Sequence, residues 1–272
     1  MLAEDPPDAS TNAEFDALIA DRAVHPVFQP IVALHDGRVV GYEALARGPA
    51  GSVFRSPQAL FAHAARAGRL AELDWICRAA ACRDALIAGL AWQLPLFVNV
   101  EPATLRVPPP PAVMDILRAA ANRLQIVIEI TERSISGDPA ILLAAVAWLR
   151  GHGMRVALDD VGADPASLAM MPLINPDVIK LDSSVVHTPD RWPVADVINA
   201  VWAQVARTGA VILAEGIETP HHLTTAQAMG ASLGQGWLFG HPGPLPGQLT
   251  PPGSTPPRTT DPATAASAAR PR

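Results

Sequence analysis

The stretch VFQPIVALHDGRVVGYEAL, residues 27–45, contains two apolar runs, Val27–Leu34 and Val39–Leu45, joined by His35-Asp36-Gly37-Arg38. Asp-Gly favours the positive φ angles of a tight hairpin turn, so the two runs are predicted to pair as antiparallel strands. Pro30 lies inside the first run, and a strand tolerates proline best beside a seam or a bulge. The sequence therefore predicts an antiparallel hairpin with an irregularity in its first strand.

Six further short apolar runs follow this hairpin. They lie at Leu96–Val100, Ile126–Ile130, Val156–Leu158, Val178–Leu181, Val211–Ala214 and around Leu233–Leu238. Segments rich in Ala and Leu separate most of these runs and are long enough for helices, at Pro57–Leu90, Ala112–Arg123, Pro139–Gly151, Pro193–Thr208 and Pro220–Met229. Strands that alternate with helices indicate a parallel α/β sheet, and eight strands of almost continuous apolar character indicate a closed barrel. The predicted fold class is a TIM-type (β/α)8 barrel with one antiparallel strand from the N-terminal hairpin.

The chain of 272 residues is expected to hold one folded domain. Its length would suit about two average domains, but α/β barrels of about 250 residues form a single domain. We expect the barrel at residues 21–249, after a short leader at residues 1–20. Residues 250–272 are rich in Pro, Thr, Ala and Ser and have no large apolar side chain. Such a tail cannot bury enough surface to offset its ordering entropy, and we expect it to be disordered.

Charge and targeting signals limit the partners and the compartment. A net charge of −6 argues against binding to a nucleic-acid polymer. Met1–Ser10 is acidic and contains proline, unlike a secretory signal, and the uncharged stretch Pro139–Leu149 is too short to cross a bilayer. Cys77 and Cys82 have no second pair with which to form a metal site, which indicates buried thiols in a reducing compartment. We expect a cytoplasmic protein without a membrane partner.

Polar residues stand at or just after the carboxyl end of nearly every predicted strand. They are Glu43, Asn99, Glu129, Asp159 with Asp160, Lys180, Glu215 and Gln235. In a barrel these ends converge on one face, where barrel enzymes place their catalytic groups. Clustered carboxylates repel one another unless a cation lies among them, and oxygen ligands favour Mg²⁺, Mn²⁺ or Ca²⁺. The adjacent Asp159-Asp160 pair could bridge two ions, as in sites that clamp the attacking and leaving oxygens of a phosphoryl displacement.

Lys180 is the single lysine of the chain, and the other 19 basic residues are arginine. A lysine kept where arginine is otherwise used indicates a task that needs a compact ammonium. The histidines, among them His187, His221 and His222, show no pairing of a nucleophile with a base, and His221 and His222 are expected at the surface.

Seven motifs extend this pattern through the chain. They are Gly41–Arg47, which contains Glu43-Ala44-Leu45 and follows Phe28–Ile31, then Phe97–Val100, Glu129–Glu132, Leu158–Asp160, Ile179–Asp182, Ala214–Thr219 and Gln235–Phe239. In this order and at these spacings the chain resembles the EAL family of cyclic dimeric GMP phosphodiesterases, over roughly residues 20–248. Glu-Ala-Leu alone would be uninformative, but the ordered set is highly specific.

The resemblance implies a role for each matching residue. By it, Glu43, Asn99, Glu129 and Asp159 hold a first metal ion, and Asp159 bridges to a second ion beside Asp160. Glu215 acts as general base or as a ligand of the second ion, and Lys180 orients the attacking water. Gln29, Glu43, Leu45, Arg47 and Gln235 bind the dinucleotide, with Arg47 on a phosphate. Glu132 supports the loop after its strand, and Glu218 helps to close the site.

The function implied by the resemblance is hydrolysis of cyclic di-GMP to linear pGpG by a metal-activated water. Two Mg²⁺ or Mn²⁺ ions are expected as cofactors, and Ca²⁺ is expected to inhibit because it is larger and polarises water weakly. A homodimer and a regulatory protein partner are further expectations. An unrelated barrel acting on another phosphoester is the remaining enzyme alternative.

The loop after Asp159-Asp160 departs from the family pattern, which continues with Phe-Gly, a small residue and Gly-Tyr-Ser-Ser. Here Val161 replaces the Phe and Asp164-Pro165 replaces the Gly-Tyr pair. Pro165 fixes φ and removes a donor, so the loop over Val161–Ser167 should be stiffer. Asp164 either adds a carboxylate near the site or caps the helix that opens at Pro165. The change motivates a second hypothesis, a non-catalytic receptor or scaffold that binds cyclic di-GMP.

Overall fold

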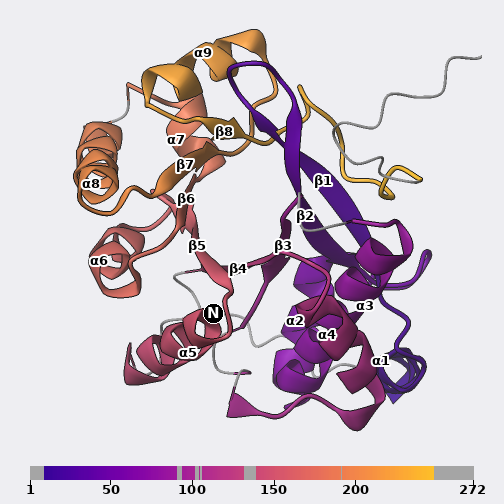
Figure 1. Cartoon of the computed structure of the whole chain (residues 1–272). Coiled ribbons are helices and arrows are strands. Elements are labelled where there is room, and N and C mark those ends of the chain that lie inside the picture. The colour runs from indigo at the N-terminus through magenta and orange to yellow at the C-terminus, as the bar shows by residue number, and fades with distance from the viewer. Residues whose placement is uncertain are drawn as a thin grey trace, which may run out of the picture.

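The structure is a computed structural model that describes residues 9–90, 94–101, 104, 106–131, 139–190 and 192–247. Its strands form a closed barrel in which the order around the sheet is the order in the chain, and β8 returns to β1 (Figure 1). The strands are β1 (His25–Ala33), β2 (Val39–Arg47), β3 (Leu96–Asn99), β4 (Ile126–Thr131), β5 (Arg155–Val161), β6 (Val178–Leu181), β7 (Val211–Ala214) and β8 (Leu233–Gly234). The predicted eight-stranded barrel is confirmed.

Strand β1 runs against the rest of the barrel. It pairs antiparallel with both β2 and β8, whereas every other neighbouring pair is parallel. The turn to β2 places Gly37 at φ 72°, and the backbone N–H of Arg38 donates to Asp36 Oδ1 at 3.0 Å. The register shifts between Ile31 and Val32, next to Pro30. The hairpin and its irregular first strand therefore form as predicted.

Helices surround the barrel, with α5, α6, α8 and α9 along one side and α1 to α4 along the other (Figure 1). They are α1 (Ala9–Asp21), α2 (Pro57–Arg66), α3 (Leu70–Ile87), α4 (Met114–Ala121), α5 (Pro139–Gly151), α6 (Pro165–Ile174), α7 (Ser183–His187), α8 (Trp192–Thr208) and α9 (Pro220–Ala228), with a 3₁₀ turn, η2 (Pro111–Val113), before α4. None of the helices in the described part of the chain is both long enough and apolar enough to span a membrane.

The helix predicted over Pro57–Leu90 is wrong as one element, because the chain breaks it into α2 and α3. Gly68 adopts φ 68° between them, a conformation that ends a helix and that residues with a side chain seldom adopt. Helix α6 begins at Pro165, where the sequence analysis placed the start of a helix, whereas α7 was not predicted. Helix α7 begins where the Asp182 side chain accepts the backbone N–H of Ser184.

The segment expected as a leader contains α1, which packs on the folded part of the chain. Phe15, Leu18 and Ile19 are buried in one cluster with Phe54 and Leu60. The boundary predicted at residue 21 stays a prediction. The predicted tail, at 250–272, lies outside the described residues.

The barrel interior is built in two layers. Its lower layer is apolar and consists of Ile31, Phe97, Val127, Ala157, Val178 and Leu213, with Leu233 against them. Side chains two residues apart on a strand point to the same face, so on β3 to β8 the residue two positions beyond each of these apolar residues also points inward. Those residues are Asn99, Glu129, Asp159, Lys180, Glu215 and Gln235. A Cβ at Gly41 on β2 would stand 3.0 Å from the Pro95 carbonyl oxygen and 3.3 Å from Phe97 Cε2, so a side chain there would be crowded.

Candidate active site

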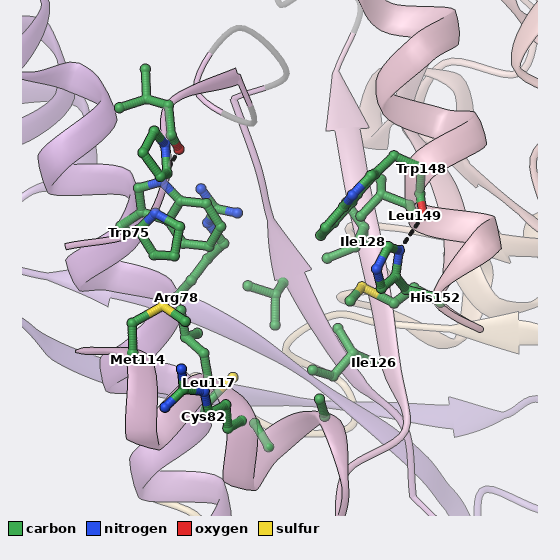
Figure 2. Close-up of a pocket in the computed structure, with 18 of the residues that line it drawn as sticks. Trp75, Arg78, Cys82, Met114, Leu117, Ile126, Ile128, Trp148, Leu149 and His152 are labelled. Atoms are coloured by element: carbon green, nitrogen blue, oxygen red, sulfur yellow. Dashed lines mark hydrogen bonds between the residues drawn. The ribbon is translucent and has the colours of Figure 1, made fainter. Parts of the chain in front are cut away.

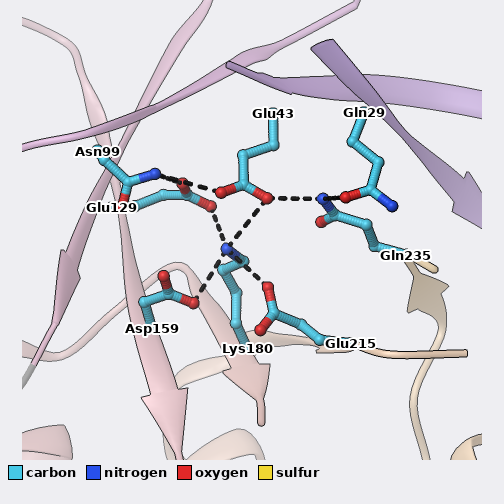
Figure 3. Close-up of polar contacts among 8 residues, drawn as sticks. All are labelled: Gln29, Glu43, Asn99, Glu129, Asp159, Lys180, Glu215 and Gln235. Atoms are coloured by element: carbon cyan, nitrogen blue, oxygen red, sulfur yellow. Dashed lines mark hydrogen bonds and ion pairs between the residues drawn. The ribbon is translucent and has the colours of Figure 1, made fainter. Parts of the chain in front are cut away.

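The polar upper layer contains side chains from every strand at whose end the sequence analysis found a polar residue. Asn99 Nδ2 donates to Glu43 Oε1 at 3.2 Å and to Glu129 Oε2 at 3.0 Å. Gln235 Nε2 donates to Glu43 Oε2 at 2.6 Å and to Gln29 Oε1 at 3.0 Å. Figure 3 shows this chain of hydrogen bonds running from Asn99 through Glu43 to Gln29. The predicted convergence of the strand ends on one face is therefore seen in the structure.

In Figure 3 the Lys180 side chain points into the centre of this cluster, with Glu129 and Glu43 above its nitrogen and Asp159 and Glu215 to either side below it. Its Nζ lies 2.6 Å from Glu129 Oε1, 2.8 Å from Glu215 Oε1, 3.0 Å from Asp159 Oδ1 and 3.6 Å from Glu43 Oε2. Lys180 and Glu129 are both 0% exposed. Four carboxylates against one ammonium leave a formal charge of −3 when all are ionised (−4 + 1).

This imbalance moves the pKa values of the cluster in different directions. Burial raises the pKa of Glu129 well above its ordinary value, and the charge of Glu43 adds to the rise. Burial likewise raises the pKa of Glu215 to about 8, against the opposing charge of Lys180. Burial opposes the ammonium form of Lys180, but the charges of Asp159 and Glu129 raise its pKa well above the ordinary value.

Glu43 is the exception among the buried carboxylates. Burial alone would raise its pKa, but the charge of Lys180 and the hydrogen bonds from Gln235 and Asn99 outweigh that effect and lower it. Without further positive charge, the cluster therefore favours the ionised form of Glu43 and the protonated forms of Glu129 and Glu215.

The donor set fits hard divalent cations. Glu129 Oε1 and Asp159 Oδ1 are buried without a hydrogen-bond partner, although Lys180 Nζ faces both at ion-pair distance. Asp159, Asp160 and Glu215 each offer a carboxylate oxygen within 4.8 Å of the others. Oxygen atoms of carboxylates and amides are the ligands that Mg²⁺, Mn²⁺ and Ca²⁺ prefer. Asp159 lies in the set of carboxylates around Lys180 and also in the set with Asp160 and Glu215, so its two oxygens could be shared between two ions.

The remaining predicted site residues lie farther from this centre. Leu45 and Arg47 continue β2 beyond Glu43, and the Arg47 guanidinium donates to the Ala46 carbonyl at 2.8 Å. Glu218 lies in the loop after β7. Within the described part of the chain, no hydrogen bond or ion pair joins these three side chains to the cluster, although the charges of Arg47 and Glu43 interact. Glu132 lies outside the described residues. The roles predicted for all of these residues stay predictions.

Two features of the site were not predicted from the pattern of polar residues at the ends of strands. Gln29 was expected only from the resemblance, because β1 runs backwards and the polar residue that it brings to this face lies in mid-strand, not at the carboxyl end. The inverted hairpin is the signal that could have placed it. His187 and His222, which showed no pairing in the sequence, stack on each other beside the loop that carries Glu215, with ring centroids 4.1 Å apart.

An apolar pocket of about 710 Å³ lies outside the barrel, between α3 and α4 on one side and α5 on the other (Figure 2). Trp75, Met114 and Trp148 line it. None of the described residues that line this pocket carries a carboxylate, and it shares no residue with the polar cluster. It is therefore separate from the candidate site.

Fold and site together define an α/β barrel with an acidic, cation-binding type of cluster at the carboxyl ends of its strands. The profile of the family described as EAL domain matches residues 12–242. The chain therefore belongs to the EAL domain family, as the sequence motifs indicated.

Individual relatives agree with this assignment. The chain is 30% identical over 236 residues to an uncharacterized signaling protein of Caulobacter vibrioides, covering 84% of this chain and 28% of that protein. It is 30% identical over 228 residues to the cyclic di-GMP phosphodiesterase NbdA of Pseudomonas aeruginosa, covering 80% of this chain and 29% of that protein. The chain thus spans less than a third of the length of either relative.

Solved structures show the same barrel. Klebsiella pneumoniae BlrP1 in a manganese and cyclic di-GMP complex superposes with a TM-score of 0.69 at 30% identity, covering 81% of this chain and 56% of that one. A calcium and cyclic di-GMP complex of the same protein gives a TM-score of 0.68, also at 30% identity, with the same coverage. These structures confirm the TIM-type fold and support a divalent metal site in this family.

The raised pKa values predict how the stability of the metal-free protein changes with pH. Glu215 and Glu129 bind more protons in the folded than in the unfolded chain between the ordinary glutamate pKa and about 8, so stability falls as the pH rises through this range. We expect the free energy of unfolding, measured by urea denaturation in chelator, to decrease between about pH 5 and pH 8. Glu215→Gln should reduce the slope, whereas the exposed Glu14→Gln should not. Equal slopes in all three proteins would contradict the assigned protonation.

Proposed function

We propose that this chain hydrolyses one phosphodiester bond of cyclic di-GMP to give linear pGpG, with two Mg²⁺ or Mn²⁺ ions. The observation that carries the proposal is the buried cluster in which four carboxylates surround Lys180, in a barrel of the EAL family. Two relatives support the substrate: NbdA is named a cyclic di-GMP phosphodiesterase, and BlrP1 binds cyclic di-GMP together with manganese.

Two overlapping sets of residues would hold the ions. Glu43, Asn99, Glu129 and Asp159 would hold the first, and Asp159, Asp160 and Glu215 the second. When bound, the ions supply positive charge against the charge that develops on the phosphoryl oxygens and lower the pKa of water. They would also neutralise the excess negative charge of the carboxylates, which the Lys180 ammonium offsets only in part.

Lys180 and Glu215 would orient the attacking water and accept its proton. Nζ of Lys180 lies within 3.0 Å of an oxygen of Glu129, Asp159 and Glu215, so its charge gathers these three carboxylates around one point. Glu215 Oε1 lies 2.8 Å from Nζ of Lys180 and faces the same point as the other carboxylates, which supports Glu215 as the proton acceptor. Glu215 also offers a carboxylate oxygen within 4.8 Å of oxygens of Asp159 and Asp160, which equally supports a role as ligand of the second ion.

The nucleotide would lie above the hydrogen-bonded half of the cluster. Gln235 and Gln29 form its edge, and Leu45 and Arg47 extend β2 beyond Glu43. The guanidinium of Arg47 suits bidentate contact with a phosphate. Glu132 and Glu218 would support and close the loops of the site. A cytoplasmic location, a homodimer and a regulatory protein partner stay predictions.

Removing single carboxylates tests the proposed activity. We expect Glu43→Ala and Glu215→Ala each to lower turnover of cyclic di-GMP with Mn²⁺ by at least about 100-fold, because each loses a group that acts on the reacting centre. Formation of pGpG is measured by chromatography. Asp115→Ala, which removes an exposed carboxylate on α4, is the matched control and should keep wild-type turnover. Comparable turnover in all four proteins would refute the site assignment.

Exchange of the cation tests the metal requirement. We expect Ca²⁺ to support binding of cyclic di-GMP but not its hydrolysis, because the larger ion occupies carboxylate sites yet polarises water weakly. Binding is measured by calorimetry with each ion, and product formation in a competition of Ca²⁺ against Mn²⁺. Full turnover with Ca²⁺ alone would show that the expectation is wrong.

The second candidate function is a receptor that binds cyclic di-GMP without cleaving it. The altered loop after Asp159-Asp160 motivates it, with Val161 and Asp164-Pro165 in place of the family's Phe and Gly-Tyr. Val161 is 0% exposed and pairs with Leu181. Replacing Val161 by the Phe of the family would overfill a closed space and cost about 1–3 kcal/mol. The informative substitution is therefore at the exposed Asp164 and at Pro165.

The loop variant separates the two candidate functions. A receptor predicts tight binding and no product in the wild type, and product only after Asp164-Pro165 is replaced by Gly-Tyr. The proposed enzyme predicts product from the wild type, with turnover raised in the variant if the stiff loop limits it. The measurement is the turnover number of both proteins at saturating Mn²⁺ and cyclic di-GMP.

A further inference from the structure

The loop that carries Glu215 is seated tightly between its neighbours. The Glu215 N–H donates to the Leu181 carbonyl at 3.0 Å, and the Ile217 N–H donates to the Gln235 carbonyl at 3.0 Å. Gly216 lies between them at φ 65°, where a Cβ would stand 2.5 Å from Ser183 Cβ. The loop therefore lies directly against the start of α7.

Two histidines hold this loop from its outer side. His187, the last residue of α7, places Nε2 2.7 Å from the Gly216 carbonyl oxygen. His222, in the first turn of α9, accepts the Glu218 N–H at Nδ1 over 3.3 Å. The two rings stack at 27° with their centroids 4.1 Å apart. We call this pair the histidine clasp.

The chemistry of the two contacts assigns the protons. A carbonyl only accepts, so Nε2 of His187 carries a hydrogen, and a backbone N–H only donates, so Nδ1 of His222 carries none. Each ring thus makes a directional contact that a purely apolar ring of the same size would lose.

The clasp also connects two strands of the site. Helix α7 follows β6, which carries Lys180, and α9 follows β7, which leads to Glu215. The side chains of Lys180 and Glu215 meet at 2.8 Å on the inner side of the same loop. The two strands pair directly up to Leu181 and Ala214, and the clasp adds a contact between α7 and the loop beyond that pairing.

We propose that the histidine clasp is a positioning device that holds Glu215 in place for the reaction. The proposal rests on the proposed function, and neither histidine touches the reacting atoms. Its contacts fix the carbonyl of Gly216 and the N–H of Glu218, one and three residues beyond Glu215. Catalytic groups tolerate little displacement, and a misplacement of about 1 Å can lower a rate about 100-fold.

Substitutions that separate the hydrogen bonds from the ring packing test the clasp. His187→Phe and His222→Phe keep a ring and lose the contact, and we expect each to lower kcat about 10- to 100-fold while KM for cyclic di-GMP changes less than about 2-fold. His187→Gln keeps an N–H near the position of Nε2, and His222→Asn keeps an acceptor near that of Nδ1. These two variants should stay within about 3-fold of wild type.

His221→Phe is the matched control, because its ring lies 6.4 Å from that of His222 and the residue is exposed. It should leave kcat unchanged. Wild-type kcat in both Phe variants of the clasp would overturn the proposal. An equal loss in the Phe, Gln and Asn variants would also overturn it, because ring packing alone would then explain the effect.

Amide hydrogen exchange of residues 215–219 provides a readout that needs no turnover. We expect faster exchange in His222→Phe than in wild type and in His221→Phe, because the Glu218 N–H loses its acceptor. If the wild type cleaves nothing, the proposed function fails, and exchange alone then decides whether the clasp holds the loop. Unchanged exchange in His222→Phe would overturn the clasp whatever the activity.

Discussion

One buried ammonium among four carboxylates is the interaction on which the rest of this site depends. Desolvation penalises every ionised group in the cluster, and Lys180 compensates only one of the four negative charges. The raised pKa values of Glu129 and Glu215 are the direct consequence, since protons supply the missing positive charge. A pair of divalent cations would supply it more completely. The same imbalance therefore links the stability of the metal-free protein to the capacity of the site for metal.

The barrel holds these charged side chains on a rigid framework. Along each strand, inward-facing residues recur every two positions, and apolar and polar ones follow each other in a fixed order. On β3 to β8 an apolar residue fills the interior two positions before each polar residue, as in Val178 and Lys180 or Leu213 and Glu215. The lower layer closes the barrel beneath the charges and keeps water from reaching them from below. On β1 the order is reversed, with Gln29 two positions before Ile31, because this strand runs in the opposite direction. The two-residue period thus explains both the order of apolar and polar residues on β3 to β8 and its reversal on β1.

The same period shows how much the sequence could predict. Apolar runs with a polar residue at their end located the strands and nominated Glu43, Asn99 and Glu215, because these signals are local. The break at Gly68 was missed, since a glycine inside an Ala-rich segment is compatible with one long helix until packing turns the chain. The stack of His187 on His222 was missed for another reason. Its partners lie 35 positions apart and meet only because α7 and α9 lie beside the same loop.

The cluster has two halves that are held in different ways. Asn99, Gln235 and Gln29 fix Glu43 through hydrogen bonds, which are directional and set the orientation of the carboxylate. Asp159 and Glu215 meet Lys180 through charge, which is not directional, so the backbone must define where they lie. The backbone features beside this second half are Asp160 at φ 56°, the buried Val161 and the contact of His187 with the Gly216 carbonyl. Sequence changes outside the cluster should therefore alter activity mainly through the ion-paired half, where the unusual loop and the two histidines lie.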